Sequence, residues 1–347
     1  MRMISEAGIV VNPDLLEEAY IPPDVPGRDS QIQELALCLL PAARRKKPLH
    51  AWLFGRPGTG KTLIAKFMLR KIEREASVSG AYVNCWENNS YYSVLDRLVR
   101  DLRILGAEKL NSSFKLERLS LYLGKKPFII VLDEIDQPKA DKRDTIIYNL
   151  CNLGNVGLVC VCNSRSVLEG MDERIRSRLN ARQIEFRSYS EDDLVFILER
   201  RASLALYPGS WDKQTLEEIA RLADGDARVA IQTLKNAGYA AEKEGSEKIE
   251  ERHIKEAYSK AKDIKKTYLL NKLSEHHRML YAIVKERKEI TSGELWKEYL
   301  KRCEKEKKQA IALRTFSEYM NKLIELDLVK WDRALVRGKV RLFRPAD

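Results

Sequence analysis

Long hydrophobic runs are absent from this sequence of 347 residues, and none approaches the ~20 apolar residues that cross a membrane. Residues 1–18 carry acidic side chains and lack the apolar core of a signal peptide. We also find no internal repeat and no long low-complexity tract. These absences argue against a membrane protein and predict a cytoplasmic one with no membrane partner.

Paired cysteine motifs are absent as well. The six cysteines are scattered, with no C-x-x-C pair and no partnering histidines. A disulfide framework or a cysteine-based metal site needs such spacing, so reduced and buried thiols are the better interpretation. Cys160 and Cys162 alternate within an apolar run, so both should face the same packed layer.

Positive charge is abundant but unevenly placed. The length predicts two or three domains, and the net charge is +11. Residues 276–347 contain 18 Lys and Arg against 11 Asp and Glu. This excess favours a polyanionic partner for the C-terminal region. A solvated, Lys/Glu-rich surface of the kind found in thermophile proteins also explains part of it, and charge alone does not separate the two.

Residues 55–62 form a phosphate-binding loop of the type G-x-x-x-x-G-K-[ST]. Its glycines allow consecutive backbone N–H groups to converge on phosphate oxygens at the start of a helix. We expect Lys61 to reach the β- and γ-phosphates and the Thr62 hydroxyl to bind Mg²⁺. The residues expected to bind the nucleotide are Gly55, Arg56, Pro57, Gly58, Thr59, Gly60, Lys61 and Thr62.

Two acids end a later apolar run, residues 128–132. Asp133 can hold the Mg²⁺ that Thr62 also contacts, and Glu134 can polarise the water that attacks the γ-phosphate. Asn163 ends the next apolar run, where it either orients that water or is an ordinary turn residue. The acids and the phosphate loop together indicate hydrolysis of a nucleoside triphosphate.

Arginines in two places have candidate catalytic roles. Arg174, Arg176 and Arg178 lie in one short segment, where one of them is an arginine finger for a neighbouring subunit or all three form a basic surface. Arg228 opens a later helix and either contacts the γ-phosphate or forms a surface salt bridge. The residues alone leave both questions open.

The order of apolar patterns predicts the architecture. Five strand-length runs alternate with helical patterns, which is typical of a parallel α/β sheet covered on both faces. From Ser190 onward the patterns are helical, up to a polar connector expected at residues 262–273. The expected strands are residues 49–54, 81–85, 128–132, 157–162 and 182–186.

The last segment predicts a winged helix. Helical patterns at residues 276–288, 292–307 and 314–326 precede short β-like runs at residues 328–331 and 339–343. Such a module either docks a protein or binds DNA, and its basic excess favours DNA. The third helix should then enter the major groove, with Phe316, Met320, Leu323 and Ile324 packed inward. The residues expected to contact DNA are Arg314, Thr315, Ser317, Asn321, Arg333, Arg337, Lys339 and Arg341.

Taken together, these motifs resemble the AAA+ ATPases and, more narrowly, the archaeal origin-recognition initiators. The resemblance rests on the order of residues 20–23, 26–28, 55–62, 132–136, 189–190 and 225–228, followed by the winged-helix tail. It implies an α/β fold, an AAA+ P-loop parallel sheet with a helical lid domain and a C-terminal winged helix. The implied domains are residues 1–188, 189–270 and 271–347.

The resemblance also implies roles for single residues. Ile21 and Arg28 belong to the segment that packs against adenine, and Tyr189 matches a nucleotide-site position. Asn163 matches the sensor 1 position and Arg228 the sensor 2 position, whereas Arg178 lies where related clamp loaders carry their finger. Residues 88–123 resemble the DNA-contacting insertion of the initiators.

By this resemblance the chain is an ATP-dependent DNA replication initiator with slow, switch-like hydrolysis of ATP to ADP. It would bind double-stranded origin DNA and help to recruit the replicative helicase, with a second initiator paralogue as a candidate partner. One alternative is a clamp-loader-like remodelling ATPase, which would normally lack the C-terminal winged helix. The other is a DNA-binding transcriptional regulator held in its ATP or ADP form, since a winged helix also serves repressors.

Overall fold

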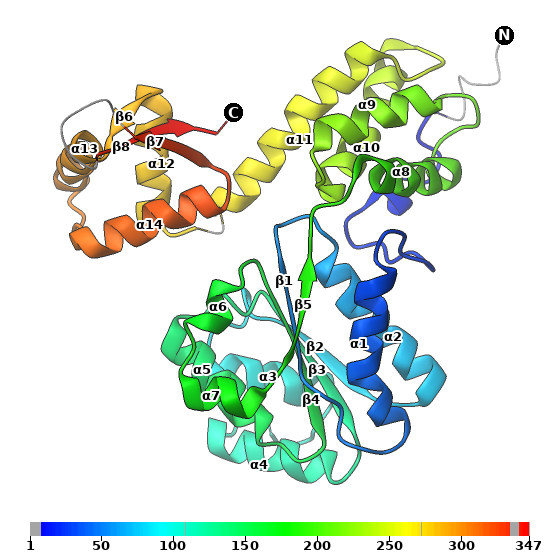
Figure 1. Ribbon diagram of the computed structural model, residues 1–347, viewed down its shortest axis with the longest axis vertical. Helices are drawn as coiled ribbons and strands as arrows, with labels where there is room; N and C mark the ends of the chain where they lie inside the picture. Colours follow the sequence, from blue (N-terminus) through cyan, green and yellow to red (C-terminus); the bar gives the residue numbers. More distant parts are fainter. Residues whose placement is uncertain (1–7, 108, 272, 334–339, 347) are drawn as a thin grey trace. The chain divides into compact units, whose positions relative to one another are not determined.

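The computed structural model describes residues 8–107, 109–271, 273–333 and 340–346, and its ribbon is shown in Figure 1. The chain forms two compact units, Met1–Tyr258 and Ser259–Asp347. The division into domains of residues 1–188, 189–270 and 271–347 stays a prediction. We describe the two units separately.

The first unit is built on a parallel five-stranded sheet in the order β2-β3-β4-β1-β5. The predicted strands are confirmed, with ends displaced by at most two residues. In parallel sheets the carboxyl ends of all strands meet at one edge, so this order places the segments after β1, β3 and β4 next to one another. The strands are β1 (Ala51–Gly55), β2 (Gly80–Asn84), β3 (Phe128–Asp133), β4 (Val156–Cys162) and β5 (Arg182–Phe186).

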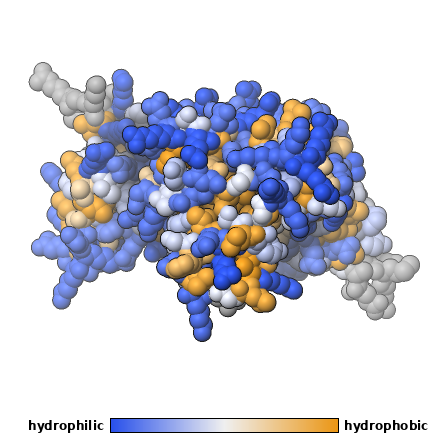
Figure 2. Space-filling view, turned by 90° about the horizontal axis from the view of Figure 1, so that it is seen from below, coloured by the Kyte–Doolittle hydropathy of each residue, from blue (hydrophilic) through white to orange (hydrophobic). Residues whose placement is uncertain are grey.

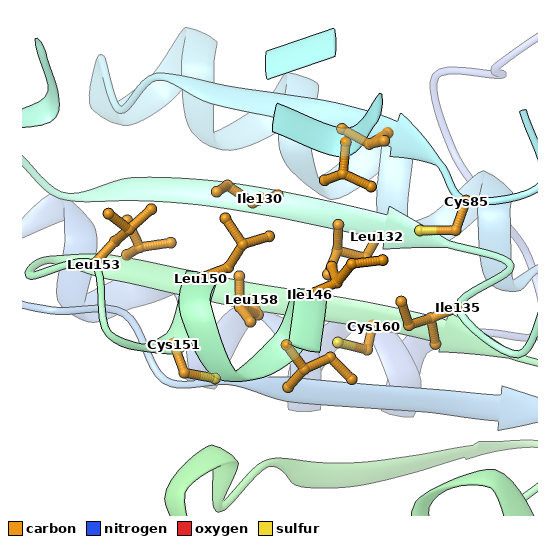
Figure 3. Packing of buried hydrophobic residues seen from close by; sticks show 14 of the residues in the cluster. Cys85, Ile130, Leu132, Ile135, Ile146, Leu150, Cys151, Leu153, Leu158 and Cys160 are labelled. Atoms are coloured by element: carbon orange, nitrogen blue, oxygen red, sulfur yellow. The ribbon is translucent and has the colours of Figure 1, made fainter. Parts of the chain in front are cut away.

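Alternate residues of the sheet pack against helices on opposite faces. Ile130 and Cys160 point into one core with α3, α4 and α5 (Figure 3). Ile129 and Val161 point into the other core with α1 and α2. Cys162 lies in the same core as Cys160, which confirms that these two cysteines face one layer. These helices are α1 (Asp29–Ala43), α2 (Lys61–Ala76), α3 (Tyr91–Asp101), α4 (Ser112–Leu123), α5 (Ala140–Cys151), α6 (Ser166–Glu169) and α7 (Glu173–Leu179).

Four helices follow the sheet and begin with a strong cap. Ser190 accepts a hydrogen bond from the backbone N–H of Asp193, whose side chain binds back to the Ser190 N–H, so α8 starts with a complete capping box. The short 3₁₀ helix η1 (Pro13–Leu16) from the start of the chain buries Leu16 in this unit. The helices are α8 (Glu191–Ala205), α9 (Lys213–Ala223), α10 (Ala227–Glu244) and α11 (Glu251–Asn271).

The polar connector expected at residues 262–273 is wrong over most of its length. Helix α11 continues through residues 262–271 without interruption. This stretch contains no glycine or proline and is rich in lysine and leucine, so helix propensity continues although the apolar pattern fades. Polarity was an insufficient sign of a loop here.

In its described residues, the second unit contains the end of α11, three further helices and a three-stranded antiparallel sheet in the order β6-β8-β7. Leu280, Tyr299, Phe316 and Phe343 are buried in its core. The expected helices and the two later strands are confirmed, whereas the two-residue strand β6 was too short to leave a sequence pattern. The elements are α12 (Glu275–Arg287), β6 (Ile290–Thr291), α13 (Ser292–Lys305), α14 (Leu313–Glu325), β7 (Val329–Arg333) and β8 (Arg341–Pro345).

Hydrophilic residues cover much of the face seen in Figure 2, with hydrophobic residues between them. Within the expected DNA-contacting insertion, residues 88–123, the structure forms α3 and α4. On α4, Phe114, Leu121 and Tyr122 are exposed large apolar residues. The contact of this insertion with DNA stays a prediction.

Candidate nucleotide site and basic C-terminal face

The loop between β1 and α2 passes through a tight space that only glycine fits. Gly58 and Gly60 have positive φ angles of 79° and 88°, in the left-handed region that favours glycine. A Cβ atom on Gly60 would lie 2.6 Å from the Tyr189 hydroxyl, and one on Gly58 would collide with the Asp226 carboxylate. The loop backbone is therefore held between the sheet and the first turn of α10.

Lys61 lies buried at the centre of this loop. Its ammonium group donates hydrogen bonds to the carbonyl oxygens of Gly55, at 2.7 Å, and Arg56, at 2.8 Å. Burial lowers the pKa of Lys61 to about 8, although the carboxylates of Asp133 and Asp136 act in the opposite direction. The structure thus places the cation where a phosphate-binding loop needs it.

Asp133 connects the loop to β3. Its Oδ2 accepts hydrogen bonds from the Thr62 hydroxyl at 2.9 Å and the Tyr82 hydroxyl at 2.7 Å, while its Oδ1 accepts from the Glu134 N–H at 2.9 Å. The carboxylate is only 3% exposed, and burial, with Asp133 beside it, raises the pKa of Tyr82. Thr62 and Asp133, which we expect to share a Mg²⁺ ion, are thus in direct contact, and their role as metal ligands stays a prediction. Tyr82 is a partner of Asp133 that the sequence reasoning missed.

Glu134 and Asn163 lie at the same edge of the sheet. Glu134 leaves β3 with a positive φ of 52°, which turns the chain sharply after the strand. The Asn163 amide, just after the adjacent strand β4, donates to Oδ2 of Asp136 at 3.3 Å. Strand order brings these predicted site residues together from positions distant in the sequence.

Arg28 joins three separate segments of the site. It is 4% exposed, and it donates to the backbone oxygens of Thr59 in the loop, at 3.0 Å, and of Arg187 after β5, at 2.7 Å. Its guanidinium also lies 3.6 Å from the centre of the Tyr189 ring. Ile21 is partly buried in the segment that leads to Arg28. Arg28 thus binds the phosphate loop directly through Thr59, and Tyr189 packs against both Arg28 and the loop at Gly60.

Arg228 belongs to the first turn of α10, which contacts the loop directly. The N–H of Ala227 donates to the Gly58 oxygen at 3.1 Å, and Asp226 caps the helix by accepting from the Arg228 N–H at 3.0 Å. The Arg228 guanidinium lies 2.5 Å from the Glu18 carboxylate. Its positive charge also reaches Lys61, where it contributes to the lowered pKa.

The arginines of α7 lie on the exposed surface of the first unit. Arg174, Arg176 and Arg178 are all exposed. The Arg178 guanidinium packs over the ring of Tyr148 on α5, 5.6 Å from its centre. An exposed arginine of this kind is accessible to a neighbouring subunit, and its role as a finger stays a prediction.

The second unit presents its expected DNA-contacting residues at the surface. Phe316, Met320 and Leu323 are buried as predicted, while Arg314, Ser317 and Asn321 are exposed on α14. Thr315 is partly buried there, and Arg333 is exposed on β7. Arg337 and Lys339 lie outside the described residues.

Several of these surface groups already bind partners within the unit. Arg314 lies 3.4 Å from Glu318. Arg341 donates to Oδ1 of Asn321 at 2.8 Å, and its guanidinium lies 4.8 Å from the centre of the Trp331 ring. The strands and the third helix are therefore linked by the same side chains that we expect to meet DNA.

The fold and the site define an AAA ATPase module followed by a lid. Family comparison agrees, because residues 24–161 match the model of the AAA ATPase domain and residues 195–259 match that of the Cdc6 AAA+ ATPase-type lid domain. Among the described residues, no helix is long and apolar enough to cross a membrane.

Full-length relatives narrow this class. The chain is 31% identical to ORC1-type DNA replication protein 1 of Sulfurisphaera tokodaii, covering 98% of this chain and 90% of that protein. It is 30% identical to the ORC1-type DNA replication protein of Pyrococcus furiosus, over 99% and 87% of the two chains. The chain belongs to the family of ORC1-type DNA replication proteins.

Solved structures agree with this assignment. The Orc1 protein of Aeropyrum pernix, determined in complex with DNA, is similar with a TM-score of 0.78 and 29% identity, over 96% of this chain and 93% of that one. The Cdc6 protein of Pyrobaculum aerophilum shares the fold, with a TM-score of 0.67 and 24% identity over 97% and 94% of the chains.

Proposed function

We propose that this chain is an ATP-dependent DNA replication initiator that binds double-stranded origin DNA and hydrolyses ATP slowly. The observation that carries the proposal is the hydrogen bond between Thr62 and Asp133, 2.9 Å long, which joins the phosphate loop to the acid of β3. It combines with family membership and a basic C-terminal region. An ATP switch and a DNA-binding module are thus carried on one chain.

The site fits an ATP or ADP molecule with Mg²⁺. Loop N–H groups and Lys61 would hold the phosphates, and Arg28 and Tyr189 would keep the loop in shape. The Thr62 hydroxyl and the Asp133 carboxylate are the hard oxygen ligands that Mg²⁺ prefers. The described residues contain no cluster of three or more His, Cys, Asp or Glu that could hold a metal, so phosphates and water would complete the coordination.

The remaining polar groups serve hydrolysis. Thr62 and Asp133 would hold a Mg²⁺ ion, which would supply neutralisation of the charge that develops on the phosphate oxygens. Glu134, at the end of β3, would accept the proton of the attacking water, and Asn163 would orient that water. Arg228 would contact the γ-phosphate from α10, and Arg178 would act on the nucleotide of a neighbouring subunit.

DNA binding is assigned to the second unit, as a winged helix. Its elements follow the expected order, and the similar Aeropyrum pernix protein was solved with DNA. Helix α14 would enter the major groove, while the strands would contact flanking phosphates. The residues proposed to contact DNA are Arg314, Thr315, Ser317, Asn321, Arg333, Arg337, Lys339 and Arg341.

A replication role implies protein partners. We assign to this chain the recruitment of the replicative helicase and, at some sites, action beside a second initiator paralogue. Mapping the chain's binding sites across its own genome tests the proposal. Clustering at replication origins is the expected result, whereas scatter over promoters would favour a transcriptional regulator.

A further inference from the structure

The segment formed by residues 9–20, which we call the strap, is fastened to the lid helices. Tyr207 donates from its backbone to Ile9 at 2.8 Å, and Val11 donates to Ala205 at 2.8 Å. Near the other end of the strap, the Arg201 side chain donates to the backbone oxygens of Leu15 and Tyr20. The strap is therefore held at both ends, so its side chains have defined positions.

Two consecutive glutamates of the strap bind two cations of α10. Glu17 pairs with Lys235, and Glu18 pairs with Arg228 at 2.5 Å. Arg228 and Lys235 are seven residues apart, so they lie on the same helix face two turns apart. Only the first of these cations belongs to the turn that contacts the phosphate loop, through the Ala227–Gly58 hydrogen bond of 3.1 Å.

One carboxylate, that of Glu18, holds the Arg228 guanidinium. Arg228 belongs to the helix turn whose Ala227 N–H donates to the Gly58 oxygen, so it lies beside the phosphate loop. The guanidinium itself is 34% exposed and is bound to Glu18. A guanidinium fork binds a carboxylate or a phosphate with the same donors, so a γ-phosphate must compete with this carboxylate.

We propose that Glu18 is a positioning residue that holds Arg228 away from the γ-phosphate and so lowers the preference for ATP over ADP. The inference rests on the proposed function, in which Arg228 contacts ATP. ADP lacks a γ-phosphate, so its binding leaves the Glu18–Arg228 pair intact. When ATP binds, by contrast, Arg228 has to release Glu18 in order to contact the γ-phosphate. An exposed ion pair of this kind corresponds to a factor of about two to five in affinity.

The test measures ATP and ADP affinities of the full chain by calorimetry in the presence of Mg²⁺. Glu18→Gln keeps the shape of an exposed side chain and removes its charge. We expect about twofold to fivefold tighter ATP binding and unchanged ADP binding. Glu17→Gln is the matched control, because it breaks the equivalent pair with Lys235, two turns from the loop, and should move neither affinity.

A double-mutant cycle separates positioning from a general effect on folding. In an Arg228→Ala background, Glu18→Gln should no longer change the ATP-to-ADP ratio, because the group that it positions is gone. The proposal is overturned if Glu18→Gln shifts both nucleotides equally or neither, or if its effect persists without Arg228. Failure of the proposed function looks different: the Lys61→Ala chain would then bind both nucleotides like the wild type.

Discussion

The two units place their functional residues in opposite environments. In the first, Arg28, Lys61 and Asp133 are 4%, 7% and 3% exposed, and contacts from several elements hold each of them. In the second, Arg314 and Asn321 are exposed and bind neighbours on their own surface. The candidate nucleotide site is therefore built by the fold itself, whereas the proposed DNA-contacting face consists of side chains that would have to exchange partners on binding.

The largest expected effects come from the buried site. Lys61→Ala should abolish tight nucleotide binding, because it removes the cation at the loop centre. Lys71→Ala, which removes an exposed cation further along α2, is the control and should bind nucleotide normally.

Glu134→Gln should leave nucleotide binding intact and reduce hydrolysis by about 100-fold or more, as expected for loss of a general base. Full ATPase activity in the Glu134→Gln chain would contradict the assignment.

Substitutions on the exposed face should have smaller and separable effects. Arg314→Ala should cost about 1–3 kcal/mol of binding to the preferred duplex and relax its sequence preference. Arg341→Ala should instead weaken binding to all sequences, and should flatten the salt dependence by up to about 0.9 log unit per lost phosphate contact. Titrations of specific and random duplexes at several salt concentrations measure both. Lys213→Ala, an exposed cation of the first unit, is a control for the loss of one charge.

The pH should separate the two units further. Lys61 has a lowered pKa of about 8, and phosphate binds its charged form, so nucleotide affinity should fall as the pH rises. Between pH 7.5 and 9.5 the charged fraction of Lys61 falls by a factor of about 25, so we expect nucleotide affinity to fall by about 25-fold, measured by calorimetry. The arginines of the DNA-contacting face keep their charge over this range. Duplex affinity should therefore change far less, and equal losses would contradict the contrast.

One buried group in the second unit should respond to acid. The His277 ring stacks on Tyr319 with ring centres 3.7 Å apart, and burial lowers its pKa to about 4. Between pH 6.5 and 4 the unfolded chain binds more protons than the folded one, so this unit should lose stability as pH falls, by about 2 kcal/mol. Hydrogen exchange of the second unit should show this loss, and His277→Phe should reduce it. An unchanged pH profile in that variant would show that His277 is not the cause.

Much of this architecture was predictable, because local patterns carried it. Strand positions depend on residues that are close in the sequence, and the structure confirms them. The phosphate loop is a local pattern too, and the structure places it between β1 and α2 as expected, while its binding of phosphate stays a prediction. The meeting of Thr62 with Asp133 followed from the rule that parallel strands share one edge. The inward side of α14 was also predicted correctly, because the apolar residues recur at helical spacing.

What escaped prediction depends on contacts between distant segments. The hydrogen bond from Tyr82 to Asp133 requires β2 to lie beside β3, which no local pattern states. Arg28 was assigned only by resemblance, and its bonds to the oxygens of Thr59 and Arg187 depend on three separate segments meeting. No sequence pattern predicted a role for Glu18, since an exposed glutamate in an acidic segment is ordinary.

The six thiols offer a practical opportunity. All are free and buried, and burial raises the pKa of Cys162 to about 12 and that of Cys151 to about 11. Thiols of this kind react slowly with maleimides, because the reactive thiolate is scarce and shielded. A cysteine introduced at one exposed position in each unit should therefore take up a fluorophore selectively. The wild-type thiols can stay in place while energy transfer follows the distance between the units as nucleotide and DNA are added.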